Sequence, residues 1–151
     1  MRPLVSRLRQ LSGSRAWPEP ADLLATWNRC GFYRLVGMEV LRADDDGSEF
    51  RIDIDDRHLQ AYGTAHGGVL AGLIDAAMGL AILARVPDRG CATVELKVNF
   101  LAPATHGPLS ARGRVVSQGR RTVVAWAEAT DVAGTLVACG LGTFQIVGGV
   151  T

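Results

Sequence analysis

The sequence has few cysteines, and their arrangement excludes two kinds of site. Three cysteines, Cys30, Cys91 and Cys139, occur in 151 residues, and no two of them form a C-x-x-C pair. A disulfide framework and a cysteine-based zinc site are therefore not supported, and no metal is expected. Free thiols in a reducing compartment explain the pattern best, which predicts a cytoplasmic protein.

The chain also lacks a large excess of charge of either sign. Sixteen Lys and Arg residues against fifteen Asp and Glu residues give a net charge of +1. This balance argues against nucleic acid as a general partner, because phosphate binding depends on clustered Lys and Arg. Residues 1–19 are an exception, since four arginines precede the first acidic residue, Glu19. We expect a flexible basic extension there, with a transit-like segment as the alternative.

Long apolar runs are scarce, and the longest, residues 67–84, is interrupted by glycines and by Asp75. Arg85, Pro87 and Asp88 follow it at once. A buried helix of a soluble domain explains this composition better than a membrane span does. Asp75 is the one charged residue in the run, and a buried charge is costly unless it is paired or hydrogen-bonded.

The remaining pattern predicts a single α+β domain over residues 20–151. Residues 20–36 predict a short helix that ends at Gly31, and residues 37–55 predict a hairpin that turns at 44–47. A glycine-bearing loop leads to a helix over roughly 67–85. Four strand-like runs follow, and the short turns between neighbouring runs favour antiparallel pairing. We therefore expect one antiparallel sheet wrapped around one long helix.

Two faces in this layout are informative. Gly68, Gly72, Asp75 and Gly79 share one side of a helix that is otherwise apolar all round, so we expect it to be buried on all sides. The small residues leave room either for a strand or second helix, or for a ligand against the carboxylate. In residues 93–100, alternation places Val94 and every second residue after it on the core face.

Asp75 is the strongest candidate for chemistry. A carboxylate on an apolar helix tends to have a raised pKa, and it can act as a general base near neutral pH. A structural Asp, hydrogen-bonded to backbone or to a partner subunit, explains the same spacing equally well. Both interpretations stay open on the sequence pattern alone.

His66, Gly67 and Gly68 stand where the loop becomes the helix. The first N–H groups of a helix lack internal partners and carry the positive end of its dipole, as an oxyanion hole requires. A plain helix start is the alternative. Asp75 lies nine residues beyond His66, about 13 Å along a helix. Two antiparallel helices from two subunits could bring both groups to one carbonyl, which predicts a dimeric active site.

Taken together, these segments resemble the hotdog-fold thioesterases of the phenylacetate-degradation (PaaI-like) family. The resemblance covers about residues 32–147 and is carried by QAYGTAHGGVLAGLIDAAMG, TVELKVNFLAPATHG and GRRTVVAWAEATDVAGTLVACGLGTFQI. It implies the hotdog fold, homodimers with shared active sites that often pair into tetramers, and hydrolysis of acyl-CoA thioesters. No cofactor is implied beyond the coenzyme A that is part of the substrate.

The resemblance also implies roles for individual residues. Asp75 matches the catalytic acidic residue, a general base or nucleophile, and the Gly67 amide matches the group that polarises the thioester carbonyl. His66 is expected to shape the loop, and Gln60 to lie close to the thioester or the attacking water. Thr93 matches a residue that helps to hold the water. It is expected on the face of its strand opposite its own helix, which suits a site shared with a neighbour.

The match is weaker for the coenzyme A contacts and the acyl group. Gly68, Arg120 and Arg121 are candidates for binding coenzyme A, although the two arginines also fit a solvated hairpin tip. Apart from the distant His106, no histidine lies near Thr93, which weakens transfer of a benzoyl-type preference. An enoyl-thioester hydratase or dehydratase and a non-catalytic acyl-CoA-binding protein remain alternatives to the thioesterase.

Overall fold

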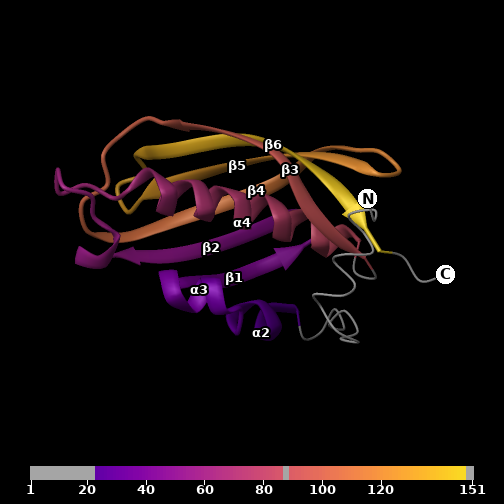
Figure 1. Cartoon of the computed structure of the whole chain (residues 1–151), viewed down its shortest axis with the longest axis horizontal. Helices are drawn as coiled ribbons and strands as arrows, with labels where there is room; N and C mark the ends of the chain where they lie inside the picture. The colour runs from indigo at the N-terminus through magenta and orange to yellow at the C-terminus, as the bar shows by residue number, and fades with distance from the viewer. Residues whose placement is uncertain (1–22, 87–88, 149–151) are drawn as a thin grey trace, which may run out of the picture.

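The structure, a computed structural model, describes residues 23–86 and 89–148 (Figure 1). The predicted basic extension, residues 1–19, and the predicted start of the first helix lie outside the described residues. The predicted α+β arrangement is confirmed, because one antiparallel sheet curves around one long helix (Figure 1).

Six strands form the sheet in the order β1-β2-β4-β5-β6-β3. The predicted first hairpin is β1 and β2, and the four later strand-like runs are β3 to β6. The bounds of the strands are Met38–Asp44 (β1), Gly47–Ile54 (β2), Gly90–Phe100 (β3), Gly107–Gln118 (β4), Thr122–Asp131 (β5) and Leu136–Val147 (β6).

One predicted pairing is wrong. The turns after β4 and β5 form hairpins, but β3 does not pair with β4 across the THGP segment. It pairs instead with β6 at the far edge of the sheet, with Gly90 opposite Val147 and Phe100 opposite Ala138. The chain therefore crosses from the edge of the sheet to its interior between β3 and β4, and β3 is an edge strand.

The long helix α4 (Gly67–Arg85) has the predicted bounds. Large apolar side chains such as Leu73, Ile74 and Met78 are fully buried against the sheet. Of the described residues, only those of α4 form a helix long and apolar enough to cross a membrane, and most of its window is buried inside the domain. The expectation of burial on all sides is wrong, because Gly72 and Asp75 are partly accessible. The curved sheet covers one side of α4 and leaves this small-residue side to other segments.

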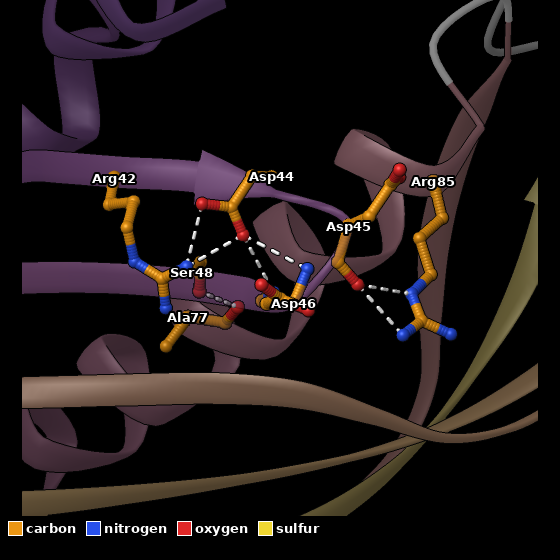
Figure 2. Close-up of polar contacts among 8 residues, drawn as sticks. Arg42, Asp44, Asp45, Asp46, Ser48, Ala77 and Arg85 are labelled. Atoms are coloured by element: carbon orange, nitrogen blue, oxygen red, sulfur yellow. Dashed lines mark hydrogen bonds and ion pairs between the residues drawn. The ribbon is translucent and has the colours of Figure 1, made fainter.

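α4 lies unusually close to the sheet at its middle. The Ser48 hydroxyl donates a hydrogen bond of 2.6 Å to the carbonyl oxygen of Ala77 (Figure 2). Opposite the same carbonyl, Gly113 of β4 has no room for a side chain, since an added Cβ would overlap that oxygen. Backbone contact between α4 and β4 therefore fixes the depth at which the helix sits in the sheet.

The end of α4 is attached to the β1–β2 turn. The Arg85 guanidinium donates two hydrogen bonds, of 3.0 and 2.8 Å, to the backbone oxygen of Asp45 (Figure 2). The turn itself is held by Asp44, whose carboxylate accepts from the backbone N–H groups of Asp46 and Gly47. The start of α4 consequently lies at the opposite end of β2 from this hairpin.

Two short helices cover part of the small-residue side of α4. They are α2 (Leu23–Asn28) and α3 (Gly31–Val36). The predicted helix end at Gly31 is wrong, because α2 ends at Asn28 and Gly31 begins α3. Next to Gly72, the Phe32 ring of α3 would lie 3.3 Å from an added Cβ. A side chain of the same subunit therefore occupies part of the space that the glycines leave.

Candidate active site

The predicted catalytic residues lie in two separate cavities of the single chain. Asp75 and Thr93 line a cavity of about 150 Å³, here called the Asp75 cavity. Gln60 and Gly67 line another of about 420 Å³, here called the Gly67 cavity. Asp75 lies eight positions after Gly67 on the helix, a rise of about 12 Å. One chain therefore does not bring the carboxylate and the helix N-terminus together.

Asp75 is partly buried on α4, and burial raises the pKa of its carboxyl group above the usual value. A hydrogen bond of 2.8 Å, donated by the Thr93 hydroxyl to Asp75 Oδ1, opposes this rise in pKa. Asp75 Oδ2 accepts no hydrogen bond from the described residues. The carboxylate thus has one oxygen fixed by the protein and one oxygen available to a water or a substrate.

The expected orientation of Thr93 is wrong. A bulge interrupts the pairing of β3 with β6, because Thr93 lies opposite Phe144 while Glu95 lies opposite Thr143. The extra residue, Val94, is 64% exposed. It shifts the alternation by one, so the Thr93 side chain points to α4 of its own chain and reaches Asp75. Thr93 is itself exposed, and the Asp75 cavity therefore opens to the surface of the single chain.

Two further ionisable groups line the Asp75 cavity. Burial, together with the charge of Asp75, raises the pKa of the Cys91 thiol to about 12. This thiol lies 3.6 Å from the carbonyl oxygen of Gly79 as a hydrogen-bond donor. Burial likewise raises the pKa of the Tyr33 hydroxyl far above its usual range. Both groups stay neutral at physiological pH, so Asp75 is the one lining residue of this cavity that carries a charge.

The start of α4 has a side-chain cap. His66 is the N-cap residue, and its Nδ1 accepts a hydrogen bond of 2.9 Å from the Gly68 N–H. The His66 N–H in turn donates to the backbone oxygen of His58 over 2.8 Å. In the part of the chain that the structure describes, the Gly67 N–H donates to no group. The predicted donor is therefore available, whereas the Gly68 N–H is used by the cap.

The other predicted residues are divided between the Gly67 cavity and the surface. The Gln60 side-chain amide donates to the Thr64 hydroxyl over 2.9 Å, and both residues line the Gly67 cavity. Arg120 and Arg121 are exposed in the β4–β5 turn. They form no ion pair with the residues that the structure describes. This turn lies at the end of the sheet where α4 ends, so one chain does not bring the arginines to Gly67.

The sequence pattern does not predict the positions of Tyr33, Trp27 and His58. Tyr33 and Trp27 line the Asp75 cavity from α3 and α2. His58 is 3% exposed, and its ring bonds to the backbone oxygen of Val36 over 2.7 Å and accepts from the backbone N–H of Asp55 over 3.0 Å. The cavity contacts of Tyr33 and Trp27 and the bond from His58 to Val36 join segments far apart in the sequence, so no local pattern predicts them, whereas the bond between Asp55 and His58 spans only three residues.

Residues 62–138 match the model of the thioesterase superfamily. The chain is 31% identical over 114 residues to a Saccharolobus solfataricus protein named provisionally as an esterase, covering 76% of each chain. It is 27% identical to acyl-coenzyme A thioesterase 13 of Pongo abelii, covering 72% of this chain and 80% of that one.

A solved structure of the phenylacetic acid degradation protein PaaI from Thermus thermophilus superimposes with a TM-score of 0.70. It is 30% identical and covers 76% of this chain and 96% of that one. With the hotdog arrangement of sheet and helix and the match over the segment that contains Gly67, Asp75 and Thr93, the chain belongs to the thioesterase superfamily.

Proposed function

We propose that the protein is an acyl-CoA thioesterase in which Asp75 activates the attacking group and the Gly67 N–H stabilises the oxyanion. The observation that carries the proposal is the state of Asp75. It is a partly buried carboxylate with a raised pKa, one oxygen bonded to Thr93 and one oxygen free in a cavity. A carboxylate with these properties suits a general base near neutral pH.

In the general-base route, Asp75 Oδ2 takes a proton from a water as the water oxygen bonds to the thioester carbonyl carbon. Negative charge develops on the carbonyl oxygen, where a Gly67 N–H and the helix N-terminus stabilise it. The carbon–sulfur bond then breaks, the leaving thiolate takes the proton that Asp75 accepted, and the products are the carboxylic acid and the coenzyme A thiol, with Asp75 ionised again. In the alternative route Asp75 attacks the carbonyl carbon itself, and water hydrolyses the resulting anhydride.

The two cavities support a site shared between subunits. In a homodimer with antiparallel α4 helices, Asp75 of one subunit would face Gly67 of the partner subunit. Among the described residues, the edge strand β3, which carries Thr93, pairs only with β6, so a second copy can lie on its outer side. The family resemblance favours a dimer of such dimers. The three free cysteines favour a cytoplasmic location.

The competing enzymatic function is an enoyl-thioester hydratase or dehydratase, which needs a histidine beside the carboxylate. None of the residues that line the Asp75 or Gly67 cavity is a histidine. The Nδ1 atom of His66 is occupied by the Gly68 N–H. These contacts favour hydrolysis. A non-catalytic acyl-CoA-binding protein would use the same cavities. A measurement of turnover distinguishes it from the enzyme.

The test is release of free coenzyme A thiol from short, medium, long and aromatic acyl-CoAs by the wild type and by Asp75→Asn. Loss of a general base is expected to lower kcat by roughly 10²- to 10⁴-fold. Circular dichroism should show that the variant stays folded. Binding without turnover by the wild type would identify a binding protein, and undiminished turnover by Asp75→Asn would exclude the proposed role of Asp75.

A further inference from the structure

The Asp75 cavity contains a hydrogen-bond donor that the proposed hydrolysis does not use. Tyr33 is 8% exposed and lines the cavity. Its hydroxyl has no hydrogen-bond partner within residues 23–86 and 89–148. Buried polar groups in proteins are almost always hydrogen-bonded, and because this hydroxyl is not among the atoms fully enclosed by protein, it needs a partner that enters the cavity. A bound group that accepts a hydrogen bond would be such a partner.

Surrounding aromatic rings fix the position of this hydroxyl. The Tyr33 ring packs edge-on against Phe50, with 5.4 Å between ring centroids, and lies 6.0 Å from the Trp27 ring. Trp27 Nε1 also lacks an acceptor, but it is fully enclosed by protein atoms. Tyr33 is therefore the unpartnered donor that a ligand in the cavity can reach.

The charges in the cavity restrict the acceptor. Burial, followed by nearby groups that include Asp75, keeps the Tyr33 pKa far above its usual range, so the hydroxyl remains a donor. The ionised Asp75 disfavours a second anion in the same cavity. The acceptor that fits is consequently an uncharged oxygen and not a carboxylate.

The size of the cavity restricts the rest of the ligand. Its volume is about 150 Å³, and its walls include the apolar residues Ala76, Leu80, Leu83 and Phe144. A cavity of this volume holds a group about as large as benzene, on the order of six non-hydrogen atoms. A short acyl chain fits within these walls, whereas a long fatty acyl chain would have to extend out of the cavity.

We propose that Tyr33 is a specificity-determining residue, whose hydroxyl donates a hydrogen bond to a hydroxyl or oxo substituent on a short acyl group bound beside Asp75. The proposal rests on the proposed thioesterase function, since it places the acyl group in the cavity that holds the catalytic carboxylate. It assigns a class of substrate, short hydroxyacyl or oxoacyl thioesters of coenzyme A.

The test compares six-carbon thioesters that differ only in one substituent: hexanoyl-CoA, its 3-hydroxy and 5-hydroxy derivatives, and adipoyl-CoA. For the wild type, the better hydroxylated substrate is expected to have a kcat/KM roughly three- to tenfold above that of hexanoyl-CoA, the effect of one hydrogen bond. Adipoyl-CoA is expected to be the poorest. In Tyr33→Phe, the ratio of hydroxylated to plain substrate should fall to about one.

Tyr62→Phe is the matched control, because it removes the same hydroxyl from a side chain that is 87% exposed and lines neither cavity. Its substrate ratio should equal that of the wild type. The ratio is measured within one protein, so partial loss of folded enzyme does not change it. A wild-type ratio of one, or a ratio that survives Tyr33→Phe, would overturn the assignment of Tyr33 while leaving the thioesterase in place.

If the protein shows no turnover, binding measurements test the role of Tyr33 independently of the proposed thioesterase function. Dissociation constants of hexanoyl-CoA and the hydroxyhexanoyl-CoAs are measured with Asp75→Asn and with Asp75→Asn combined with Tyr33→Phe. Tighter binding of a hydroxylated thioester that depends on Tyr33 would support the acyl assignment even without hydrolysis. Equal binding of plain and hydroxylated thioesters would contradict it.

Discussion

The Thr93 hydroxyl lies 2.8 Å from Asp75 Oδ1 and joins the edge strand β3 to the central helix α4. This hydrogen bond requires the bulge at Val94, because regular alternation would turn Thr93 away from the helix. It opposes the rise in the Asp75 pKa that burial causes. The bond therefore keeps the carboxylate ionised over a wider range of pH, and it leaves the second oxygen available for the proposed role as a base.

Thr93→Val removes this donor with little change in volume, so the pKa of Asp75 should rise further above its usual value. Because the active form is the ionised carboxylate, activity is lost as the pH falls through this pKa. The acidic limb of the kcat/KM profile should move to higher pH in Thr93→Val. Thr93→Ser keeps the hydroxyl and should leave the limb close to its wild-type position. An acidic limb that does not move in Thr93→Val would separate Thr93 from the ionisation of the base.

How far the sequence predicts this site is seen at Thr93. The family resemblance predicts that Thr93 lies close to the acidic residue Asp75. It does not predict which face of its strand carries the Thr93 side chain. Alternation predicts core positions correctly at Leu96 and Val98, which pack against the core, but not at Phe100, which is 55% exposed. It is wrong at Thr93 and Val94, because a bulge adds one residue and depends on pairing with β6. Pairing between strands far apart in the sequence produces no local pattern, so the bulge cannot be predicted from the alternation of residues.

The same distinction applies to the helices and to the sheet order. The bounds of α4 are predictable because a long apolar run, interrupted only by glycines and Asp75, lies between His66 and Pro87 in the sequence. The position of β3 beside β6 is not predictable from turn signals, because residues 101–106 connect distant strands instead of forming a hairpin. The position of Tyr33 beside Asp75 is not predictable for a related reason, since the short helix that carries Tyr33 reaches Asp75 only through tertiary contacts.

The Gly67 N–H can be removed without disturbing the helix. Gly67 is the first residue of α4, a position where proline is tolerated, and His66 already has the extended conformation that precedes proline (φ −63°, ψ 136°). Gly67→Pro should lower kcat by roughly 10²- to 10³-fold, the effect of losing one oxyanion donor. Steady-state kinetics on the best substrate of the acyl-CoA panel measures this.

Gly67→Ala is the control for the added side chain. An added Cβ would lie 3.2 Å from Phe100 Cζ. The Phe100 ring is 55% exposed and can move by the few tenths of an ångström required. Gly67→Ala keeps the N–H and should retain most of kcat. Equal losses in both variants would indicate a steric effect and would count against the oxyanion role.

The contact between α4 and β4 leads to a prediction about stability. Gly113→Ala would place a methyl group against the carbonyl of Ala77, which is backbone and already accepts a hydrogen bond from Ser48. We expect a loss of about 3 kcal/mol or more in the free energy of unfolding, since neither segment can move aside. Urea denaturation should show a lower midpoint. Gly31→Ala, with no atom within 4 Å of the added Cβ, should change stability by less than about 1 kcal/mol.

A shared active site predicts complementation between two inactive variants. In a homodimer of Asp75→Asn both sites lack the carboxylate, and in a homodimer of Gly67→Pro both lack the donor. A mixed dimer would contain one site with Asp75 from one chain and Gly67 from the other, and one site with neither. Random pairing of the coexpressed chains makes half of the dimers mixed, so activity should recover to about a quarter of the wild-type value.

The controls for complementation use the same two chains. Each variant coexpressed with a differently tagged copy of itself should stay inactive, which excludes an effect of coexpression. Mixed dimers purified through both tags should have about half of the wild-type activity, because one of their two sites is intact. If each chain carried a complete site, every site in the mixture would contain one of the two defects, and no activity would return. Absence of recovery in purified, folded mixed dimers would therefore contradict the shared site.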